Sequence, residues 1–414
     1  MPITYLCRKC DKDYSKEEFA QNKFCLSCGS FLMPNFRVQN QGLTATREAA
    51  ESDNSIREKS ALSRAAESLR QRVSQSKEYE IVPETAKEEH KKPVLESWIW
   101  SAEYNDALYL EGELIKQYQG KSLEDAISGK VVSNEQGECY AISDSCTSNF
   151  KLVPYQESRQ HVISDLKVLS GIGPVGEQTL RRKGYETVED LKRHPRWKKQ
   201  AADYMKMIDS KEVDSIQKWL WQRLPKSHPL LHYLAGFCHD QDFAIIDIET
   251  LGLSERPIIL LGIAKPKKDH ICTNQFLLRD IQDEPSAIWS LVSQLEPNLS
   301  LITFNGRSFD IPYIKQRLAY YGLDAPLDNP HFDVLHFTRR ALRHKLSDCK
   351  LDTVEKYIGI KRDVNIPGAL VPHFYETYLK TKNVGPLVPI VEHNKQDLLT
   401  LGSLFSKLYE EWNL

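Results

Sequence analysis

The sequence predicts an α/β protein whose main domain is a mixed sheet flanked by helices. Three observations lead to this prediction. Short apolar runs alternate with amphipathic stretches over residues 235–414, a polar segment separates this part from the N-terminus, and cysteines occur in closely spaced pairs near the start. Because 414 residues exceed one ordinary domain, we expect several domains.

We expect five regions in chain order, each marked by a change in composition. They are a small metal-binding ribbon at 1–36, a polar linker with a helical segment at 37–95, a small mixed α+β module at 96–155, a helical module at 156–228, and the α/β domain at 235–414.

The N-terminal cysteines have the spacing of a metal site, because each Cys-x-x-Cys pair can form a tight turn around one ion. Two pairs supply the thiolates of a tetrahedral zinc site, which is structural because no coordination position stays open. Redox pairs or disulfides are the alternative. We expect one structural Zn²⁺ held by Cys7, Cys10, Cys25 and Cys28.

The segment from Gln39 to Lys92 is polar and almost without aromatic residues, so it cannot bury enough surface to fold alone. A helix within it is predicted by apolar residues at helical spacing between Leu62 and Val73. Further on, the pattern predicts a short helix at 122–127 and strands at 129–132 and 137–142.

The helical module contains the turn Gly171-Ile172-Gly173 followed by Pro174, which suits the first position of a helix. Backbone N–H groups at such a helix start can bind phosphate. The segment resembles a helix-hairpin-helix, a module that grips nucleic-acid backbones without reading sequence. A purely structural hairpin is the alternative, and Val175 stands where many family members have Lys or Arg.

In the α/β domain, Asp247 and Glu249 end an apolar strand and emerge on the same face, one pleat apart. Two such anions repel each other unless a cation lies between them, and Mg²⁺ or Mn²⁺ prefers carboxylate oxygens. The alternative is that both acids are ordinary solvated residues at a strand end without a functional role. We predict strands at 243–248, 258–264, 271–277 and 300–304, and helices near 285–295, 311–321 and 386–411.

Further candidate ligands occur downstream in suitable contexts. Asp310 follows a predicted strand and a glycine-containing turn and opens an amphipathic stretch, although a helix N-cap is the alternative. His393 and Asp397 are four residues apart and share one helix face, although a lone histidine is more often an ordinary surface or core residue. Four acids and one imidazole can therefore converge.

Together these motifs resemble the DEDD exonucleases of the ribonuclease H-like superfamily, and within it the YprB-like predicted exonucleases. The resemblance runs from about Gln241 to the C-terminus through Asp-Ile-Glu-Thr-Leu-Gly-Leu at 247–253, Phe-Asn-Gly-x-x-Phe-Asp at 304–310 and His-Asn-x-x-Asp at 393–397. It implies a ribonuclease H-like core. We interpret Asp333 as a helix cap or supporting group, not a ligand.

The resemblance also implies two Mg²⁺ or Mn²⁺ ions, with Asp247 bridging both, Glu249 and Asp397 completing one site and Asp310 holding the other. His393 would orient or deprotonate the attacking water. Its spacing to Asp397 is that of the branch that uses tyrosine at this position. We expect nucleic acid to contact Gly171, Ile172, Gly173, Arg181, Arg182, Lys183, Thr250 and Asn305.

Composition narrows the classes of function. A formal net charge of −2 and a pI near 6.7 argue against a globally basic nucleic-acid binder but allow local basic patches. No apolar run is long enough to span a membrane and the N-terminus lacks a signal-peptide core, so we expect a cytoplasmic protein without membrane contact.

The expected function is a metal-dependent nuclease, with a 3′ to 5′ exonuclease favoured over other modes. DNA is favoured over RNA by analogy with other enzymes that carry helix-hairpin-helix modules. A structure-selective endonuclease or resolvase of the same fold is one alternative. A non-catalytic nucleic-acid-binding scaffold is another, and a protein partner can bind through the ribbon or the linker.

Overall fold

The computed structural model of the chain describes residues 4–7, 12–15, 33–35, 94–148, 150–362 and 366–412. Contacts divide the chain into two compact units. One comprises Met1–Glu113 and Pro367–Lys382, and the other comprises Leu114–Ile366 and Asn383–Leu414.

The first unit contains a small antiparallel sheet and two helices. Strands β1 (Thr4–Cys7), β2 (Lys12–Tyr14) and β3 (Met33–Asn35) are ordered β2-β1-β3. Helix α14 spans Val371–Thr381, and most of α3 (Val94–Gln117) also lies here. Of the predicted zinc ligands, Cys7 ends β1, whereas Cys10, Cys25 and Cys28 lie outside the described residues, as does the linker up to residue 93. The zinc site and the linker therefore remain predictions.

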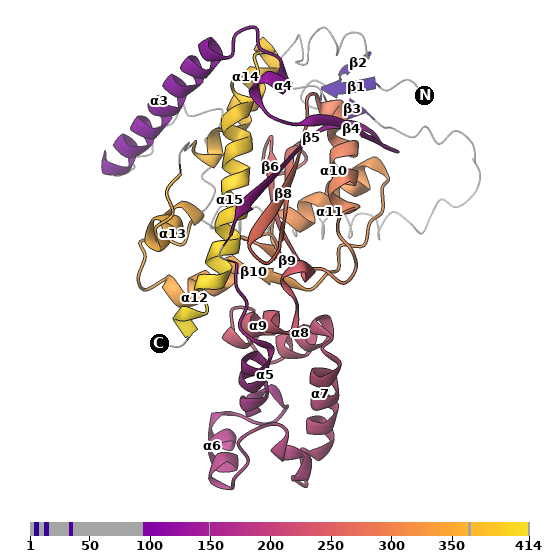
Figure 1. Cartoon of the computed structure of the whole chain (residues 1–414), viewed down its shortest axis with the longest axis vertical. Helices are drawn as coiled ribbons and strands as arrows, with labels where there is room; N and C mark the ends of the chain where they lie inside the picture. The colour runs from indigo at the N-terminus through magenta and orange to yellow at the C-terminus, as the bar shows by residue number, and fades with distance from the viewer. Residues whose placement is uncertain are drawn as a thin grey trace, which may run out of the picture. The chain divides into compact units, whose positions relative to one another are not determined.

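The second unit is built on a seven-stranded mixed sheet of order β10-β9-β6-β7-β8-β5-β4 (Figure 1). Strands β6, β9 and β10 are parallel, and the other pairs are antiparallel. The predicted mixed sheet is thus confirmed. The strands are β4 (Lys130–Asn134), β5 (Gly137–Thr147), β6 (Phe243–Thr250), β7 (Ile258–Pro266), β8 (His270–Leu277), β9 (Ser300–Thr303) and β10 (His331–Asp333).

Strands β4 and β5 come from the segment that we predicted as a small mixed module. They extend the core sheet, because β5 pairs with β8 over eight residues from Tyr140 to Thr147. Helix α4 (Leu123–Ala126) precedes them and begins with a capping box in which Ser122 and Asp125 exchange hydrogen bonds.

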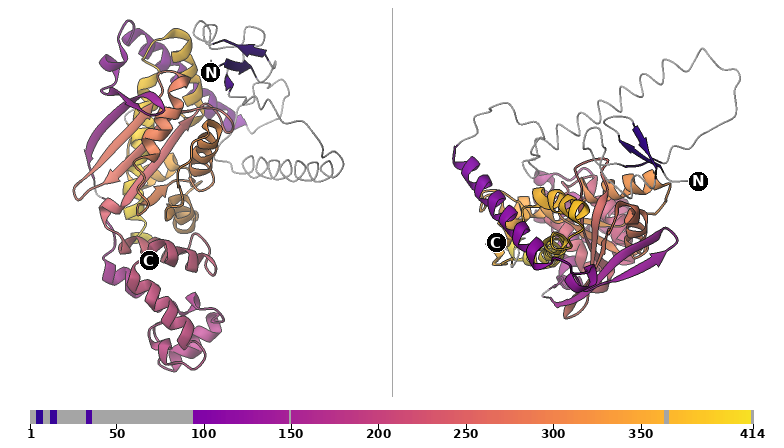
Figure 2. Two further views of the ribbon diagram at one scale, coloured as in Figure 1. Left: turned by 90° about the vertical axis from the view of Figure 1, so that its right-hand side faces the viewer. Right: turned by 90° about the horizontal axis from the view of Figure 1, so that it is seen from above.

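Helices flank the sheet as predicted (Figures 1 and 2). The long helix α15 runs along one face, where Gly262 and Gln275 face it, and Gln275 donates hydrogen bonds to the Val391 carbonyl and to Asn394. The remaining helices of this part are α10 (Glu284–Val292), α11 (Asp310–Tyr321), α12 (Val334–Leu342), α13 (Leu351–Ile358) and α15 (Leu387–Lys407).

A helical module precedes the sheet's central strands and docks against strand β10. The side chain of Gln217 both accepts from the His331 N–H (3.1 Å) and donates to its carbonyl (3.2 Å), which covers an edge that would otherwise expose backbone groups. Its helices are α5 (Tyr155–Ser164), α6 (Pro174–Arg182), α7 (Lys198–Ser210), α8 (Val213–Trp221) and α9 (Pro229–Tyr233).

Aromatic side chains join this module to the core. His232 on α9 is fully buried, stacks on Tyr409 at 3.9 Å between ring centroids, and accepts a hydrogen bond from the Trp412 indole. Burial lowers the pKa of His232 to about 3, so this imidazole is a neutral core group. None of the described helices is both long and apolar enough to cross a bilayer.

Candidate functional site

Strand β6 supplies the first two acids of the site. Asp247 and Glu249 alternate with buried isoleucines, so both side chains leave the strand on the same face, as predicted, and this face is turned toward α15. Asn394 on α15 donates from Nδ2 to the carboxylate of Asp247 (2.7 Å) and to its carbonyl oxygen (3.1 Å). Asn394 is itself fully buried and held by Gln275, so Asp247 has a fixed orientation.

The close approach of Asn394 depends on a glycine in the neighbouring strand. Gly262 pairs with Asp247 across β6 and β7. A Cβ atom at this position would lie 2.3 Å from Asn394 Oδ1 and 2.9 Å from Leu398 Cδ1, far inside van der Waals contact. Glycine is therefore required for helix α15 to lie this close to the acids.

Asp310 reaches the same region from the turn after β9. It is the first residue of α11, following the N-cap Phe309, and so is not itself the cap. The turn is held by Asp333, whose carboxylate accepts the N–H groups of Asn305 (2.8 Å) and Arg307 (3.2 Å). Asp333 also caps α12, which agrees with our interpretation of it as a cap. Asn305 adopts φ 65°, a left-handed conformation that asparagine tolerates.

Helix α15 contributes the remaining predicted residues. His393 Nε2 lies 3.5 Å from Asp397 Oδ2 on the same helix face and 3.8 Å from Glu249 Oε1 on β6. The structure therefore brings together the five residues predicted from three motifs, which are Asp247, Glu249, Asp310, His393 and Asp397.

An arginine that the sequence did not reveal also occupies this site. Arg362, which follows α13, forms a bidentate ion pair with Glu355 at 2.5 and 2.9 Å and is also bonded to the Asp397 carboxylate. Its side chain is only 8% exposed. Among the described residues, it is the one arginine or lysine in contact with any of the four acids. Glu355 belongs to the segment Leu351-Asp352-Thr353-Val354-Glu355, which also resembles the family, but no pattern in the sequence joins Arg362 to Asp397, 35 residues away.

Arg362 also fixes the state of the imidazole. Its Nη1 lies 3.0 Å from His393 Nδ1, and because a guanidinium only donates, Nδ1 must accept. Burial lowers the pKa of His393, so the ring is neutral and carries its hydrogen on Nε2, toward Glu249 and Asp397. In this arrangement the imidazole has no free lone pair with which to take a proton from water.

The carboxylates are electrostatically unbalanced. Burial, followed by the charge of Asp397, raises the pKa of Asp247 and of Glu249 well above their ordinary values. Burial also raises the pKa of Asp310 to about 7, with further contributions from Asp333 and Asp397, although backbone N–H groups partly oppose the shift. Buried carboxylates that repel each other in this way favour either protonation or a bound cation.

The donor set suits hard divalent cations, because it consists of carboxylate oxygens. As the side chains lie, however, the described part of the chain contains no group of three His, Cys, Asp or Glu residues arranged to hold an ion. One oxygen of Asp397 is instead taken by Arg362. Binding of an ion by this oxygen would require Asp397 to exchange the arginine for the ion, whereas its other oxygen faces His393.

The predicted nucleic-acid-binding residues fall into two places. Gly171 adopts φ 83°, Ile172 is buried, and Gly173 caps α6 without any side-chain hydrogen bond, which leaves the helix start to backbone groups. Arg182 and Lys183 are exposed, whereas Arg181 is bonded to Glu177, Glu186 and the Ser164 carbonyl. Thr250 is the last residue of β6, next to Glu249 in the chain, and Asn305 lies in the turn after β9 that Asp333 holds.

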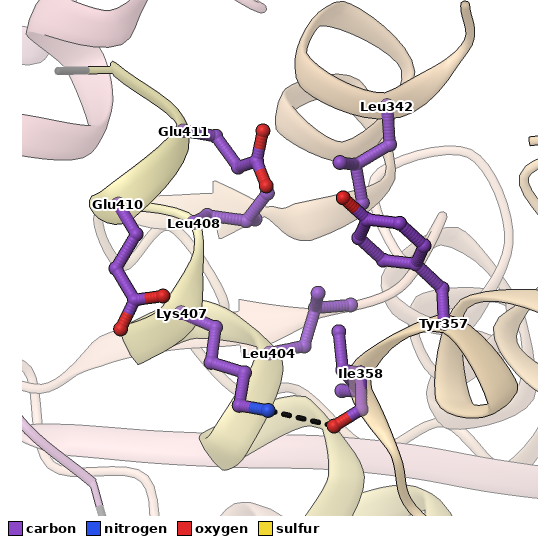
Figure 3. A pocket seen from close by; sticks show the side chains of 8 residues that line it. All are labelled: Leu342, Tyr357, Ile358, Leu404, Lys407, Leu408, Glu410 and Glu411. Carbon is purple, nitrogen blue, oxygen red and sulfur yellow. Dashed lines mark hydrogen bonds between the residues drawn. The ribbon is translucent and has the colours of Figure 1, made fainter. Parts of the chain in front are cut away.

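A small pocket lies elsewhere, between α12, α13 and α15 (Figure 3). It measures about 230 Å³ and is lined by Leu342, Tyr357, Leu404, Lys407 and Glu411 among others. Lys407 Nζ is bonded to the Ile358 carbonyl at 2.6 Å, as the dashed line shows. The pocket holds none of the converging acids and has no evident chemistry.

Comparison with known proteins defines the class of the domain that carries these acids. Residues 244–409 match the family model of the RNase_H superfamily. The chain is 34% identical over 192 residues to the uncharacterized protein YprB of Bacillus subtilis strain 168, covering 45% of this chain and 46% of that protein. The chain thus spans less than half the length of this relative.

Solved structures with similarity to the chain include two nucleic-acid enzymes. A family B DNA polymerase from Pyrobaculum calidifontis aligns with a TM-score of 0.32 and 16% identity, covering 40% of this chain and 24% of the polymerase. Exonuclease I of E. coli in complex with a dT13 oligonucleotide aligns with a TM-score of 0.26 and 14% identity, covering 38% of this chain and 45% of the exonuclease.

Proposed function

We propose that the protein is a metal-dependent nuclease that hydrolyses phosphodiester bonds, acting from the 3′ end of DNA. The observation that carries this proposal is the gathering of four largely buried carboxylates from β6, α11 and α15, which among the described residues have a single arginine in contact to offset them. Such an excess of buried negative charge is unfavourable without a ligand, and divalent cations suit these donors.

Each residue has a distinct task in this proposal. Asp247 would bridge two Mg²⁺ or Mn²⁺ ions, Glu249 and Asp397 would complete one site, and Asp310 would serve the other. When bound, such ions activate a water and stabilise the leaving oxygen of the phosphodiester. Asn394 keeps Asp247 oriented, and Asp333 holds the turn that delivers Asp310.

His393 is better suited to orient water than to deprotonate it. Its Nδ1 is occupied by the Arg362 N–H, so the nitrogen that faces the acids carries a hydrogen and donates. A role as general base would require Arg362 to leave this hydrogen bond first. Arg362 therefore decides which of the two tasks the imidazole can perform.

The remaining parts of the chain would hold the substrate. Backbone N–H groups at the Gly171–Gly173 turn, with Arg182 and Lys183 nearby, would bind phosphates as a helix-hairpin-helix does. The N-terminal cysteines would bind one structural Zn²⁺, which measurement of the metal content of the purified chain would test.

Cleavage of a labelled single strand of DNA, its duplex and the corresponding RNA, each with Mg²⁺ or Mn²⁺, tests the proposal. We expect mononucleotides released from the 3′ end, and a loss on the order of 10³-fold in Asp247→Asn because a bridging ligand is removed. Asp328→Asn is the matched control, since this acid is exposed and outside the site.

The outcomes separate the alternatives. Cleavage of a circular single strand would indicate an endonuclease, because a circle has no end. Binding without cleavage under any metal condition would indicate a scaffold and would contradict the proposal. Equal rates in Asp247→Asn and the wild type would also contradict it.

A further inference from the structure

A cluster of basic side chains lies where the helical module meets the α/β core. We call it the basic junction, and it consists of Trp221, Lys226, Arg307, His336, Arg339 and Arg340. The Arg307 guanidinium stacks on the Trp221 ring at 3.9 Å from the centroid and donates to the His331 carbonyl at 3.1 Å. Lys226 Nζ lies 5.9 Å from the same ring.

Helix α12 supplies the other half of the basic junction. One side of the helix is buried, whereas His336, Arg339 and Arg340, at helical spacings of three and four, lie on its more exposed side. Lys226 and Arg340 form no ion pair with any residue that the structure describes. The module and α12 therefore present positive charge together.

Arg307, Arg339 and Lys226 lie close enough to His336 to act on its charge. Burial lowers the pKa of His336, and Arg307, Arg339 and Lys226 lower it further, whereas Asp333 opposes the shift. Asp333 is 3% exposed and already accepts backbone N–H groups of the turn. A concentration of like charge with one buried acid is suited to an anionic partner.

The basic junction is also continuous with the candidate site. Arg307 belongs to the turn held by Asp333, three residues before Asp310. At its other end, Trp221 closes α8 of the helical module. The Arg307–Trp221 pair thus connects the module to the turn that carries Asp310.

We propose that the basic junction binds a single-stranded segment of nucleic acid on its way from the helical module to the acid cluster. This inference rests on the proposed nuclease function and adds a substrate class to it. The cations would contact successive phosphates, and the Arg307–Trp221 pair would offer a flat face to an unstacked base. In a duplex the bases stay stacked on one another, so their faces are not available to stack on these protein side chains.

Fluorescence anisotropy with the full chain in buffer without Mg²⁺ or Mn²⁺, where we expect no cleavage, tests the proposal. The probes are a labelled strand of about 20 nucleotides, as DNA and as RNA, and the blunt DNA duplex of the same sequence. The test variant is Lys226→Ser/Arg339→Ser/Arg340→Ser. The matched control, Lys130→Ser/Lys267→Ser/Lys268→Ser, removes the same charge from exposed positions elsewhere.

We expect the test variant to bind the single strand at least about tenfold more weakly and to show a salt slope smaller by about 2, since each lost phosphate contact removes about 0.7. The control should stay within about twofold of the wild type. Equal losses in both variants would overturn the proposal, as would a loss confined to the duplex or no single-strand binding by the wild type. Unchanged melting temperatures verify that all variants are folded.

A parallel cleavage assay with Mg²⁺ separates this proposal from the nuclease proposal. If the test variant binds the strand more weakly but the wild type does not cleave it, the proposal for the basic junction is supported and the nuclease proposal is rejected. Normal cleavage by the wild type with unweakened binding by the test variant would reject the basic junction alone.

Discussion

The α/β core contains two clusters of buried charge that differ in how they are balanced. In the first, Glu284 at the start of α10 is fully buried against Arg317 on α11, at 2.6 and 2.7 Å. The same carboxylate accepts the Tyr321 hydroxyl (2.5 Å) and the Ile258 N–H (2.9 Å). In the second, Asp247, Glu249, Asp310 and Asp397 share one arginine that is also bound to Glu355.

This difference separates structural charge from functional charge. A buried ion pair whose partners are all satisfied fastens two helices and needs nothing else. A buried group of acids with too little positive charge persists in a fold because a ligand completes it. The contrast predicts that the same chemical change, loss of one negative charge, will have opposite consequences for stability at the two places.

The largest expected effect is on the balanced cluster. Glu284→Gln should lower the free energy of unfolding by about 3–5 kcal/mol, because it leaves Arg317 buried without its counter-charge. Glu249→Gln, the matched change among the acids, should leave stability unchanged or increased in metal-free buffer, because it removes repulsion. Urea unfolding of both variants in EDTA measures these changes in the free energy of unfolding. Equal destabilisation of the two variants would contradict the predicted difference between the clusters.

The sequence allowed the unbalanced cluster to be found, because its acids occur in ordered motifs on recognisable elements. Asp247 and Glu249 end an apolar strand, and His393 and Asp397 have helical spacing. The predicted strands at 243–248, 258–264 and 271–277 are present in the structure as β6, β7 and β8. Short apolar runs of strand length were sufficient to predict these elements.

What the sequence did not reveal depends on contacts between distant segments. Glu284 and Arg317 are 33 residues apart and no pattern joins them. The pairing of β5 with β8 spans more than a hundred residues, so β5 was not predicted to belong to the core sheet. The contact of Arg362 with Asp397 was not predicted for the same reason, because 35 residues separate them.

Arg362 provides a second test, because it is the cation of the unbalanced cluster. Arg362→Gln should lower the free energy of unfolding by about 2–3 kcal/mol, since Glu355 and Asp397 lose their partner. Added Mg²⁺ should restore more stability to this variant than to the wild type, because an ion can then take the place of the arginine at Asp397.

Thermal unfolding with and without Mg²⁺ measures both parts of this prediction. Lys218→Gln is the control, because its ion pair with Asp214 is on the surface and its removal should leave stability unchanged. A smaller response to Mg²⁺ in Arg362→Gln than in the wild type would show that Arg362 organises the acids instead of substituting for a cation.

The pH dependence of stability offers a third test. Burial raises the pKa of Asp310 to about 7, above its value in the unfolded chain, so the folded protein binds this proton more tightly. Its contribution is therefore fully present below about pH 4 and is lost as the pH rises through about 7. In EDTA, the free energy of unfolding of the wild type should fall by on the order of 2 kcal/mol relative to that of Asp310→Asn between pH 5 and pH 8. Parallel pH profiles for the two proteins would contradict this.

The smallest expected effect concerns the space that the acids require. Gly262→Ala would place a methyl group 2.3 Å from Asn394 Oδ1, so Asn394 must shift and its bond to Asp247 weakens. We expect a destabilisation of about 1–2 kcal/mol, with cleavage reduced by about tenfold. Gly112→Ala is the control, because nothing lies within 4 Å of the added atom and alanine favours the helix there.

Comparison with Asn394→Ala decides how the effect of Gly262→Ala arises. If the added methyl acts through Asn394, the double variant should cleave no more slowly than Asn394→Ala alone, because the same hydrogen bond to Asp247 is already lost. Additive losses would instead mean that Gly262 sets the distance between α15 and the sheet. In that case the orientation of Asp247 would depend on how closely the helix approaches β7, with Asn394 following that approach.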